Sequence, residues 1–364
     1  MTSIIYSEKK FRVVLYVILI ALFTGLTIGL TPKSSFQPLE KLSDYGFFKG
    51  NIAEQMPAEG VLPYSLPTPL FTDYAQKLRF VKVPSGQKAA YNPTQVLEFP
   101  TGTVLIKTFY YYNDERKPQK GRRLMETRLL IHETDGWVAF PYHWNEEQTD
   151  AFLEVAGDTK PVKWVNDKGK KVMLDYAMPN LNQCKGCHNI DGKFMPIGPS
   201  ARQLNHALDP VFGVNVPNQL RFWEAQGILS GLPADNNEIP AIAIWDDPKS
   251  GTLNDRARAW LDINCAHCHN AKGPANTSGL FLDIHQKDPH VWGIFKAPVA
   301  AGRGSGGHQF DINPGQPESS IIHFRMASTD PGIMMPEIGR KMVHTEAVEL
   351  IREWILQMDP KAYQ

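Results

Sequence analysis

Two copies of the motif Cys-x-x-Cys-His limit what this chain can fold into more than any other feature. The copies begin at Cys184 and Cys265, and together they contain all four cysteines of the 364 residues. The two thiols of such a motif can each add to a vinyl group of one haem, and the histidine that follows becomes the proximal iron ligand. A Cys-x-x-Cys pair also occurs in zinc and redox sites, but a histidine directly after both pairs favours haem. We therefore expect two covalently bound haem c groups, held by Cys184, Cys187, His188, Cys265, Cys268 and His269.

The N-terminal residues predict export. Lys9, Lys10 and Arg12 precede residues 13–30, a stretch of 18 residues without a charge. This stretch is just long enough to span a bilayer, and no Ala-x-Ala cleavage site follows it. We expect residues 13–30 to anchor the body on the periplasmic side of the inner membrane, with the positive flank in the cytoplasm. A cleaved signal peptide and a periplasmic protein are the alternative.

The spacing of apolar and turn residues divides the chain into five parts. Residues 1–32 are expected to be a signal anchor or signal peptide, residues 33–60 a tether, and residues 61–175 an antiparallel β domain. Residues 176–250 are the first haem-binding segment, and residues 251–364 a cytochrome c-like domain with the second haem. The expected fold class is therefore α+β, with an N-terminal membrane helix, an antiparallel β domain and two mainly α-helical haem-binding segments.

Within the β domain, alternating apolar residues separated by turn residues predict short strands of a sandwich or barrel-like sheet. The expected strands cover residues 78–83, 96–99, 104–110, 126–132 and 137–142. His132 and His143 fall in this pattern and are expected to be sheet residues. Residues 144–150 are expected to begin a helix.

Helical spacing of apolar residues marks four later segments. They are residues 202–208, 218–228, 253–263 and 345–358, the last with Thr345 as its cap. Pro179 argues against a long helix leading into the first motif, whereas the third segment runs into Cys265. A helix that enters the motif, a later Met-Pro loop and a closing helix resemble the parts of a class I cytochrome c domain.

Each proximal histidine leaves one open position on its iron, where methionine would favour simple electron transfer. For the second haem we expect Met335, because Pro336 stiffens the loop that presents its sulfur. The alternatives are Met334 and Met326. For the first haem the candidates are Met195, Met178 and His206, and an iron without a sixth protein ligand stays open. His267 is expected to point to solvent, and Arg303 and Arg340 are candidates to pair with haem propionates.

Six segments carry a resemblance to a known family. They are residues 42–46, 68–75, 113–116, 142–149, 182–188 and 264–270, which read LSDYG, TPLFTDYA, NDER, YHWNEEQT, NQCKGCH and NCAHCHN. On these segments the chain resembles a family of bacterial di-haem c-type cytochromes, and the likeness covers most of the chain after residue 42. The resemblance implies haem attachment at both motifs and electron transfer as the default role. It implies no substrate.

Three functional hypotheses follow. The first is an exported di-haem c-type cytochrome that carries electrons between a redox protein partner and a respiratory or dehydrogenase chain. The alternative is a di-haem peroxidase-type enzyme with an open coordination site on the first haem. A third takes the β domain as a docking module with residues 109–112 as its binding face. The formal net charge is +0, from 38 basic and 38 acidic residues, so no nucleic-acid partner is indicated.

Overall fold

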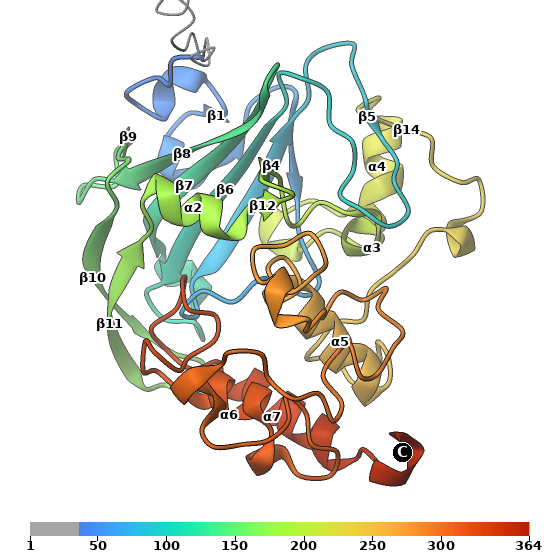
Figure 1. Cartoon of the computed structure of the whole chain (residues 1–364). Coiled ribbons are helices and arrows are strands. Elements are labelled where there is room, and N and C mark those ends of the chain that lie inside the picture. The colour runs from blue at the N-terminus through green and yellow to red at the C-terminus, as the bar shows by residue number, and fades with distance from the viewer. Residues whose placement is uncertain (1–35, 364) are drawn as a thin grey trace, which may run out of the picture. The chain divides into compact units, whose positions relative to one another are not determined.

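The largest element is a six-stranded antiparallel sheet (Figure 1). The computed structural model describes residues 36–363, and residues Pro38–Gln364 form one compact unit. The strands lie in the order β3-β4-β6-β7-β8-β9. Their bounds are β3 Val61–Tyr64, β4 Gln76–Lys82, β6 Val104–Tyr112, β7 Arg122–Glu133, β8 Gly136–Trp144 and β9 Ala151–Leu153. Most neighbours in the sheet are also neighbours in the chain, as in a meander of hairpins.

Both faces of the sheet are covered, so its strands are apolar on both sides. In β6 only Lys107 and Tyr112 are less than fully buried. Residues 42–57 cover one face, where the rings of Phe48 and Phe80 meet with their centroids 5.1 Å apart. The opposite face carries two hydrophobic clusters. One includes Val81, Leu105 and Trp223, and the other includes Phe109, Tyr111 and Trp164. Lys107 therefore lies between two apolar clusters on that face.

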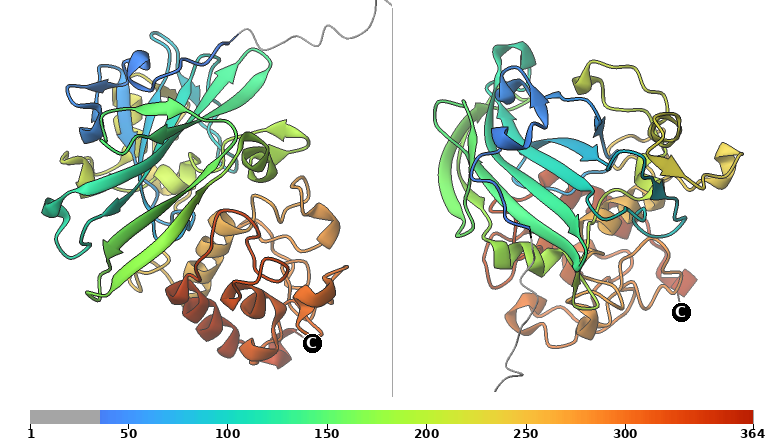
Figure 2. Two further views of the ribbon diagram at one scale, coloured as in Figure 1. Left: turned by 90° about the vertical axis from the view of Figure 1, so that its left-hand side faces the viewer. Right: turned by 90° about the horizontal axis from the view of Figure 1, so that it is seen from above.

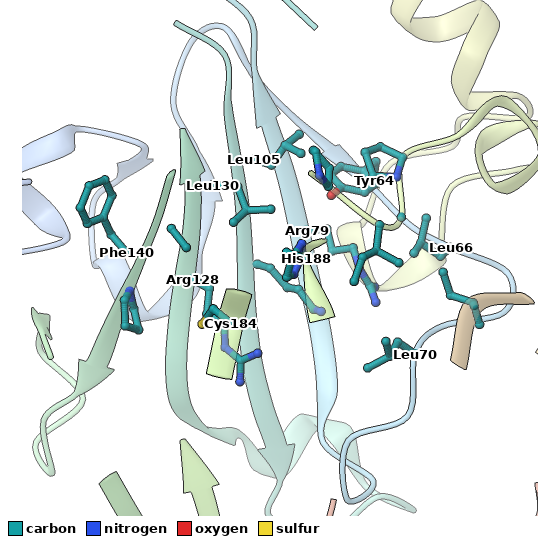
Figure 3. A pocket seen from close by; sticks show the side chains of 18 residues that line it. Tyr64, Leu66, Leu70, Arg79, Leu105, Arg128, Leu130, Phe140, Cys184 and His188 are labelled. Carbon is teal, nitrogen blue, oxygen red and sulfur yellow. The ribbon is translucent and has the colours of Figure 1, made fainter. Parts of the chain in front are cut away.

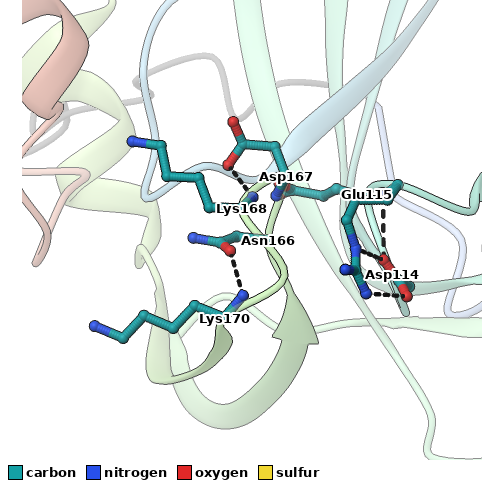
Figure 4. Close-up of polar contacts among 7 residues, drawn as sticks. Asp114, Glu115, Asn166, Asp167, Lys168 and Lys170 are labelled. Atoms are coloured by element: carbon teal, nitrogen blue, oxygen red, sulfur yellow. Dashed lines mark hydrogen bonds and ion pairs between the residues drawn. The ribbon is translucent and has the colours of Figure 1, made fainter.

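A separate hairpin follows the sheet and supplies part of the second cluster. Its strands are β10 Asp158–Val165 and β11 Lys171–Met178. Asn166 and Asp167 shape the turn, because their side chains accept hydrogen bonds from backbone N–H groups of the same turn (Figure 4). The backbone N–H of Asp167 donates to the Glu115 carboxylate at 2.9 Å, which ties this turn to the β6–β7 connection.

The segment with the first motif is built from short elements. They are α2 Leu181–Cys187, β12 Asn189–Ile190, β13 Lys193–Phe194, α3 Ala201–Leu204, α4 Gln219–Ala225 and β14 Leu229–Ser230. The small strands β1 Phe48–Lys49, β2 Met56–Pro57 and β5 Ala89–Ala90 belong to earlier parts of the chain, and β5 pairs with β14 in parallel. In Figure 1, α2 lies across the face of the sheet near β6, β7 and β8.

The segment with the second motif packs around its own core. Its helices are α5 Leu253–Asn264, α6 Ile321–Ala327 and α7 Thr345–Leu356. Trp260 of α5 joins Ile351 and Trp354 of α7 in one buried cluster. The left view of Figure 2 shows this part, coloured orange to red, beside one end of the sheet. Short 3-10 turns connect the elements of the whole chain: Ser43–Tyr45, Ile52–Glu54, Pro118–Lys120, Pro210–Phe212, Asn236–Glu238, Asn276–Ser278, Gly302–Ser305, Pro317–Ser319 and Pro360–Tyr363.

The loop between β3 and β4 joins the sheet to this C-terminal part. The buried carboxylate of Asp73 accepts hydrogen bonds from the backbone N–H groups of Lys341 and Met342, both at 2.7 Å. The backbone N–H of Phe71 donates to the side chain of Asn264 at 2.7 Å. These contacts hold the end of α5, and with it the second motif, against the sheet.

The expected fold class is wrong. The described residues hold a mainly antiparallel β structure and six short α-helices, and neither of the segments expected to bind haem is mainly α-helical. In residues 176–250 the helices α2, α3 and α4 have only 7, 4 and 7 residues. The physical reason is that eight prolines and six glycines in those residues interrupt helical hydrogen bonding. No helix within residues 36–363 combines the length and apolar character needed to cross a bilayer. The expected anchor, residues 13–30, lies outside the described residues.

Several local predictions also need correction. Residues 144–150 form no helix; β8 ends at Trp144, and the Asn145 side chain organises a turn by accepting the Thr149 N–H at 2.9 Å. The helices expected over 202–208 and 218–228 are shortened to α3 and α4. Thr345 is the first helical residue of α7 rather than its cap, which is His344. The helix over 253–263 is confirmed as α5, and the expected strands over 78–83, 104–110, 126–132 and 137–142 are found as β4, β6, β7 and β8. The strand expected over 96–99 is wrong, because these residues form only isolated bridges at Val96 and Glu98.

Candidate cofactor site

The first motif is presented by a short helix with a defined start. The Asn180 side chain accepts the Gln183 N–H, and the Gln183 side chain accepts the Asn180 N–H, both at 2.9 Å. This reciprocal capping box fixes the first turn of α2. Cys184 and Cys187 are then three residues apart, so their thiols lie on neighbouring positions of one helical face. That spacing suits attachment of both thiols to one flat group.

His188 ends this helix with one ring nitrogen already engaged. Its Nδ1 lies 2.7 Å from the carbonyl oxygen of Met195, and its ring stacks on Phe194 with centroids 5.0 Å apart. A carbonyl only accepts, so Nδ1 carries the proton and the lone pair of Nε2 is free. Burial lowers the pKa of His188 to about 3. A neutral imidazole whose other nitrogen donates to a carbonyl is the form that binds iron.

The second motif follows α5 directly and repeats this arrangement. The backbone N–H of His269 donates to the Cys265 carbonyl at 2.9 Å, which closes the motif into one turn. His269 Nδ1 lies 3.3 Å from the Ser278 hydroxyl, whose single proton is donated to the Ala275 carbonyl. Nδ1 of His269 is therefore the donor, and burial lowers the pKa of this histidine to about 4. Its Nε2 is also available to a metal.

An open pocket lies between the first motif and the sheet. It has about 780 Å³ of empty space, counting the part continuous with solvent, and Cys184 and His188 line it. Figure 3 shows Arg79 and Arg128 together with Cys184 and His188 over the strands. The Cys184 thiol and the free Nε2 of His188 are the donors that a haem attached through the first motif needs, whereas Cys187 lies outside this lining, beside the second motif.

A row of cations forms the floor of this pocket, and no local pattern in the sequence predicted it. Arg79 of β4 lies opposite Lys107 of β6, and Lys107 lies opposite Arg128 of β7. Arg128 is paired with the fully buried Glu126, which also accepts a hydrogen bond from Tyr176 at 2.7 Å. The signal in the sequence was a basic residue at an inward position of each strand, but the strand register was needed to bring the three together.

The two motifs meet, although 76 residues separate them. Sγ of Cys187, a ring nitrogen of His267 and Sγ of Cys268 lie within 4.8 Å of one another. Asp191 donates its backbone N–H to the Lys272 carbonyl at 2.9 Å, so the segments after both motifs are also joined. His267 therefore faces the first motif, and the expectation that it points to solvent is wrong. Its Nδ1 is buried without a hydrogen-bond partner among the described residues.

The four thiols differ in their environments. Burial raises the pKa of Cys184, and it raises the pKa of Cys265 to about 12. The pKa of Cys187 is lowered because Cys268 and His267 stabilise its thiolate by hydrogen bonding. Since a thiolate is the nucleophilic and metal-binding form, these neighbours favour the reactive form at Cys187.

Met335 lies in a second pocket in the C-terminal part. This pocket has about 280 Å³ of empty space and is also lined by Met326, Trp260 and Arg340. The Arg340 side chain donates to the Met335 carbonyl at 2.9 Å, and the Met335 N–H donates to the Arg325 carbonyl at 3.1 Å. These bonds fix the backbone that carries the methionine. Its role as the distal ligand of the second haem stays a prediction.

The three candidates for the first haem lie outside the pocket lining. The carbonyl of Met195 accepts the hydrogen bond from His188 Nδ1. The Met195 side chain packs in the cluster around Trp223. Met178 is buried in the cluster of Trp164. His206 Nε2 lies 3.2 Å from the Ser65 carbonyl. The distal role of Met195 stays an untested prediction, and its position favours a role in orienting His188.

The two arginines considered for propionates differ in exposure. Arg303 is exposed and forms an ion pair with Asp330. Arg340 is buried and donates to the carbonyl oxygens of Arg325, Met335 and Met342. Neither pairing with a propionate is tested by these contacts.

Comparisons with protein-family models, with curated proteins and with solved structures give no match to this chain. Its function is therefore argued from the site itself.

Proposed function

We propose that this protein is an exported di-haem c-type cytochrome that carries single electrons between a redox protein partner and a respiratory or dehydrogenase chain. One observation carries the proposal. Each of the two Cys-x-x-Cys pairs is followed by a half-buried, neutral histidine whose Nδ1 is held by an acceptor and whose Nε2 is free. A surface histidine or a zinc knuckle does not require this arrangement at both motifs.

Each part of the motif has a separate role in this proposal. Cys184 and Cys187 attach the first haem and Cys265 and Cys268 the second, as thioethers. The Met195 carbonyl and the Ser278 hydroxyl orient the histidines and fix their tautomers. When bound, each haem supplies reversible one-electron chemistry. The apolar clusters beside both sites exclude water, which limits the reorganisation that accompanies a change of charge.

The contact between the motifs supports electron exchange between the two sites. Cys187 and Cys268 are each the second thiol of their motif, and their sulfurs lie within 4.8 Å. The two attachment points are therefore adjacent. This placement supports a relay in which one site takes an electron from the partner and passes it to the other.

A second candidate function has its own observation. Among the described residues that line the first pocket there is no methionine and no histidine other than His188. An iron without a sixth protein ligand would be open to a small oxidant, as in a di-haem peroxidase-type enzyme. Arg79 and Tyr64 line the same pocket, and their side chains could donate hydrogen bonds to an oxidant bound there.

A metal site is the competing interpretation of the cysteines. Cys187, His267 and Cys268 have the composition of a zinc site with two thiolates and one imidazole, to which a fourth ligand would add. This interpretation leaves Cys184, Cys265 and the two held histidines without a role. We therefore favour haem.

Near-infrared magnetic circular dichroism of the oxidised, mature protein tests the function, because it reports the axial ligands of each haem. Two low-spin six-coordinate haems support the carrier. A high-spin signal that changes when cyanide or peroxide is added supports the enzyme and contradicts a pure carrier. The variant Cys184→Ala/Cys187→Ala assigns each signal, since it removes the first haem only.

A further inference from the structure

The proposed function gives no role to the row of cations under the first motif. Arg79, Lys107 and Arg128 occupy directly opposed positions on three adjacent strands. Opposed side chains in a sheet have Cβ atoms roughly 4.5–5.5 Å apart, and like charges at such positions destabilise the sheet. A row of this kind inside a protein therefore points to an anion that it binds.

Most of this positive charge is not neutralised within the described residues. Arg128 donates hydrogen bonds from Nε and Nη2 to the two carboxylate oxygens of Glu126, so its charge is neutralised by Glu126. Arg79 is only 6% exposed, yet its side chain makes no ion pair and no hydrogen bond with any described residue. Lys107 likewise makes no hydrogen bond or ion pair with any described residue, and its Nζ lies 4.8 Å from the centroid of the Phe109 ring. Burial lowers the pKa of Lys107 well below its ordinary value, although the Glu126 carboxylate acts on it in the opposite direction. Two cations are left for a ligand.

The position of the row limits what the ligand can be. All three cations line the pocket that also contains Cys184 and His188, and apolar residues such as Leu105, Leu130 and Ile197 line the rest. The ligand is therefore a large apolar body that carries about two negative charges, or a small anion held beside such a body. Leaving the buried Arg79 and the half-buried Lys107 charged without an anion would cost free energy for each charge.

We propose that Arg79 and Lys107 bind the two carboxylates of the first haem, so that the β sheet is the receptor for this cofactor rather than a separate docking module. This inference rests on the proposed function, because it assumes haem attachment at Cys184 and Cys187. In this arrangement α2 binds one edge of the cofactor through its thiols, and the sheet binds the edge that carries the carboxylates. A carboxylate or other oxyanion from solution is the alternative source of the same chemistry.

Redox titration of Arg79→Gln and Lys107→Gln tests the proposal in the mature full-length protein. The matched control is Lys82→Gln, which removes a cation from the same strand as Arg79 but over Phe47 on the opposite face. Both pocket variants are expected to keep the covalent first haem and to lower its potential, because a nearby cation stabilises the reduced form. Arg79→Lys is expected to restore most of the shift, and the control to leave both potentials unchanged.

Three results overturn the proposal. The first is an unchanged potential of the first haem in both pocket variants. The second is an equal shift in the Lys82→Gln control. The third is a saturable effect of acetate or inorganic phosphate on the wild-type first haem that is lost in Arg79→Gln, since the row would then bind an anion from solution. A wild-type protein without haem at Cys184 and Cys187 instead removes the proposed function, and intact mass distinguishes that outcome.

Discussion

The same five-residue motif lies in two different surroundings in this molecule. The first copy, on α2, faces a pocket whose floor is a charged sheet and whose lining within the described residues has no methionine. The second copy follows the 12-residue helix α5 and belongs to a part with its own apolar core and the Met335 loop. On the proposed function, the motif would determine where a haem is attached, while the surrounding residues would determine its ligands and its potential.

The largest expected effect separates the two attachment sites. Cys184→Ala/Cys187→Ala should remove one haem of the two, and Cys265→Ala/Cys268→Ala the other, because each pair serves one cofactor. Intact mass and haem staining of the denatured protein measure this. A variant that loses both haems, or neither, would break the assignment of one haem to each motif.

Met335→Ala sharpens the comparison next. If Met335 is the distal ligand, the second iron alone should become high-spin and its potential should fall, because loss of the thioether removes a ligand that raises the potential. Met326→Ala is the matched control from the same pocket. The optical spectrum and a redox titration give the readout. A response to Met326→Ala and none to Met335→Ala would exchange their roles.

Acid should affect both sites through the same physical cause. Burial lowers the pKa of His188 to about 3 and that of His269 to about 4, from an ordinary 6.5. Below pH 6.5 the unfolded chain therefore binds protons that the folded chain does not, so stability is lost as the pH falls. The slope is about 1.4 kcal/mol per pH unit for each histidine.

Urea unfolding of the haem-free protein, followed by circular dichroism at several values between pH 7 and pH 4.5, measures this slope. Haem must be absent because an iron-bound Nε2 would not take up the proton. In His188→Gln the slope should be smaller by about 1.4 kcal/mol per pH unit, the share of one histidine. Burial lowers the pKa of other histidines as well, that of His344 to about 4, so the remaining slope is not that of His269 alone. Stability that is flat across this range would show that these rings are not buried in neutral form.

The smallest expected effect compares the helix starts that precede the motifs. Asn180 caps α2 and Thr252 caps α5, each in a reciprocal capping box. Replacement of either by Ala should cost about 1 kcal/mol in the free energy of unfolding. Asn180→Asp and Thr252→Ser are the conservative controls.

Haem incorporation adds a second readout for the capping variants. The Asn180 change should lower incorporation more than the Thr252 change, because α2 has only 7 residues while α5 has 12. Equal haem incorporation in both variants would contradict the expectation that the shorter helix depends more on its cap.

Sequence reasoning reached the parts of the site that depend on local spacing. The helix entering Cys265 was predictable because its apolar residues recur at helical intervals. The row of Arg79, Lys107 and Arg128 was not predictable, because it depends on the register of three strands. The contact of Cys187 with Cys268 depends on tertiary packing that no local pattern encodes. The helical content of residues 176–250 was overestimated because their prolines and glycines received too little weight.

Intact mass spectrometry of the full-length protein, matured in a host that assembles c-type cytochromes and then denatured, tests the central claim most directly. We predict two covalent haem adducts on one polypeptide, one on the peptide with Cys184 and Cys187 and one on the peptide with Cys265 and Cys268. A polypeptide without haem adducts, or native protein that carries zinc at Cys187, His267 and Cys268, would contradict it.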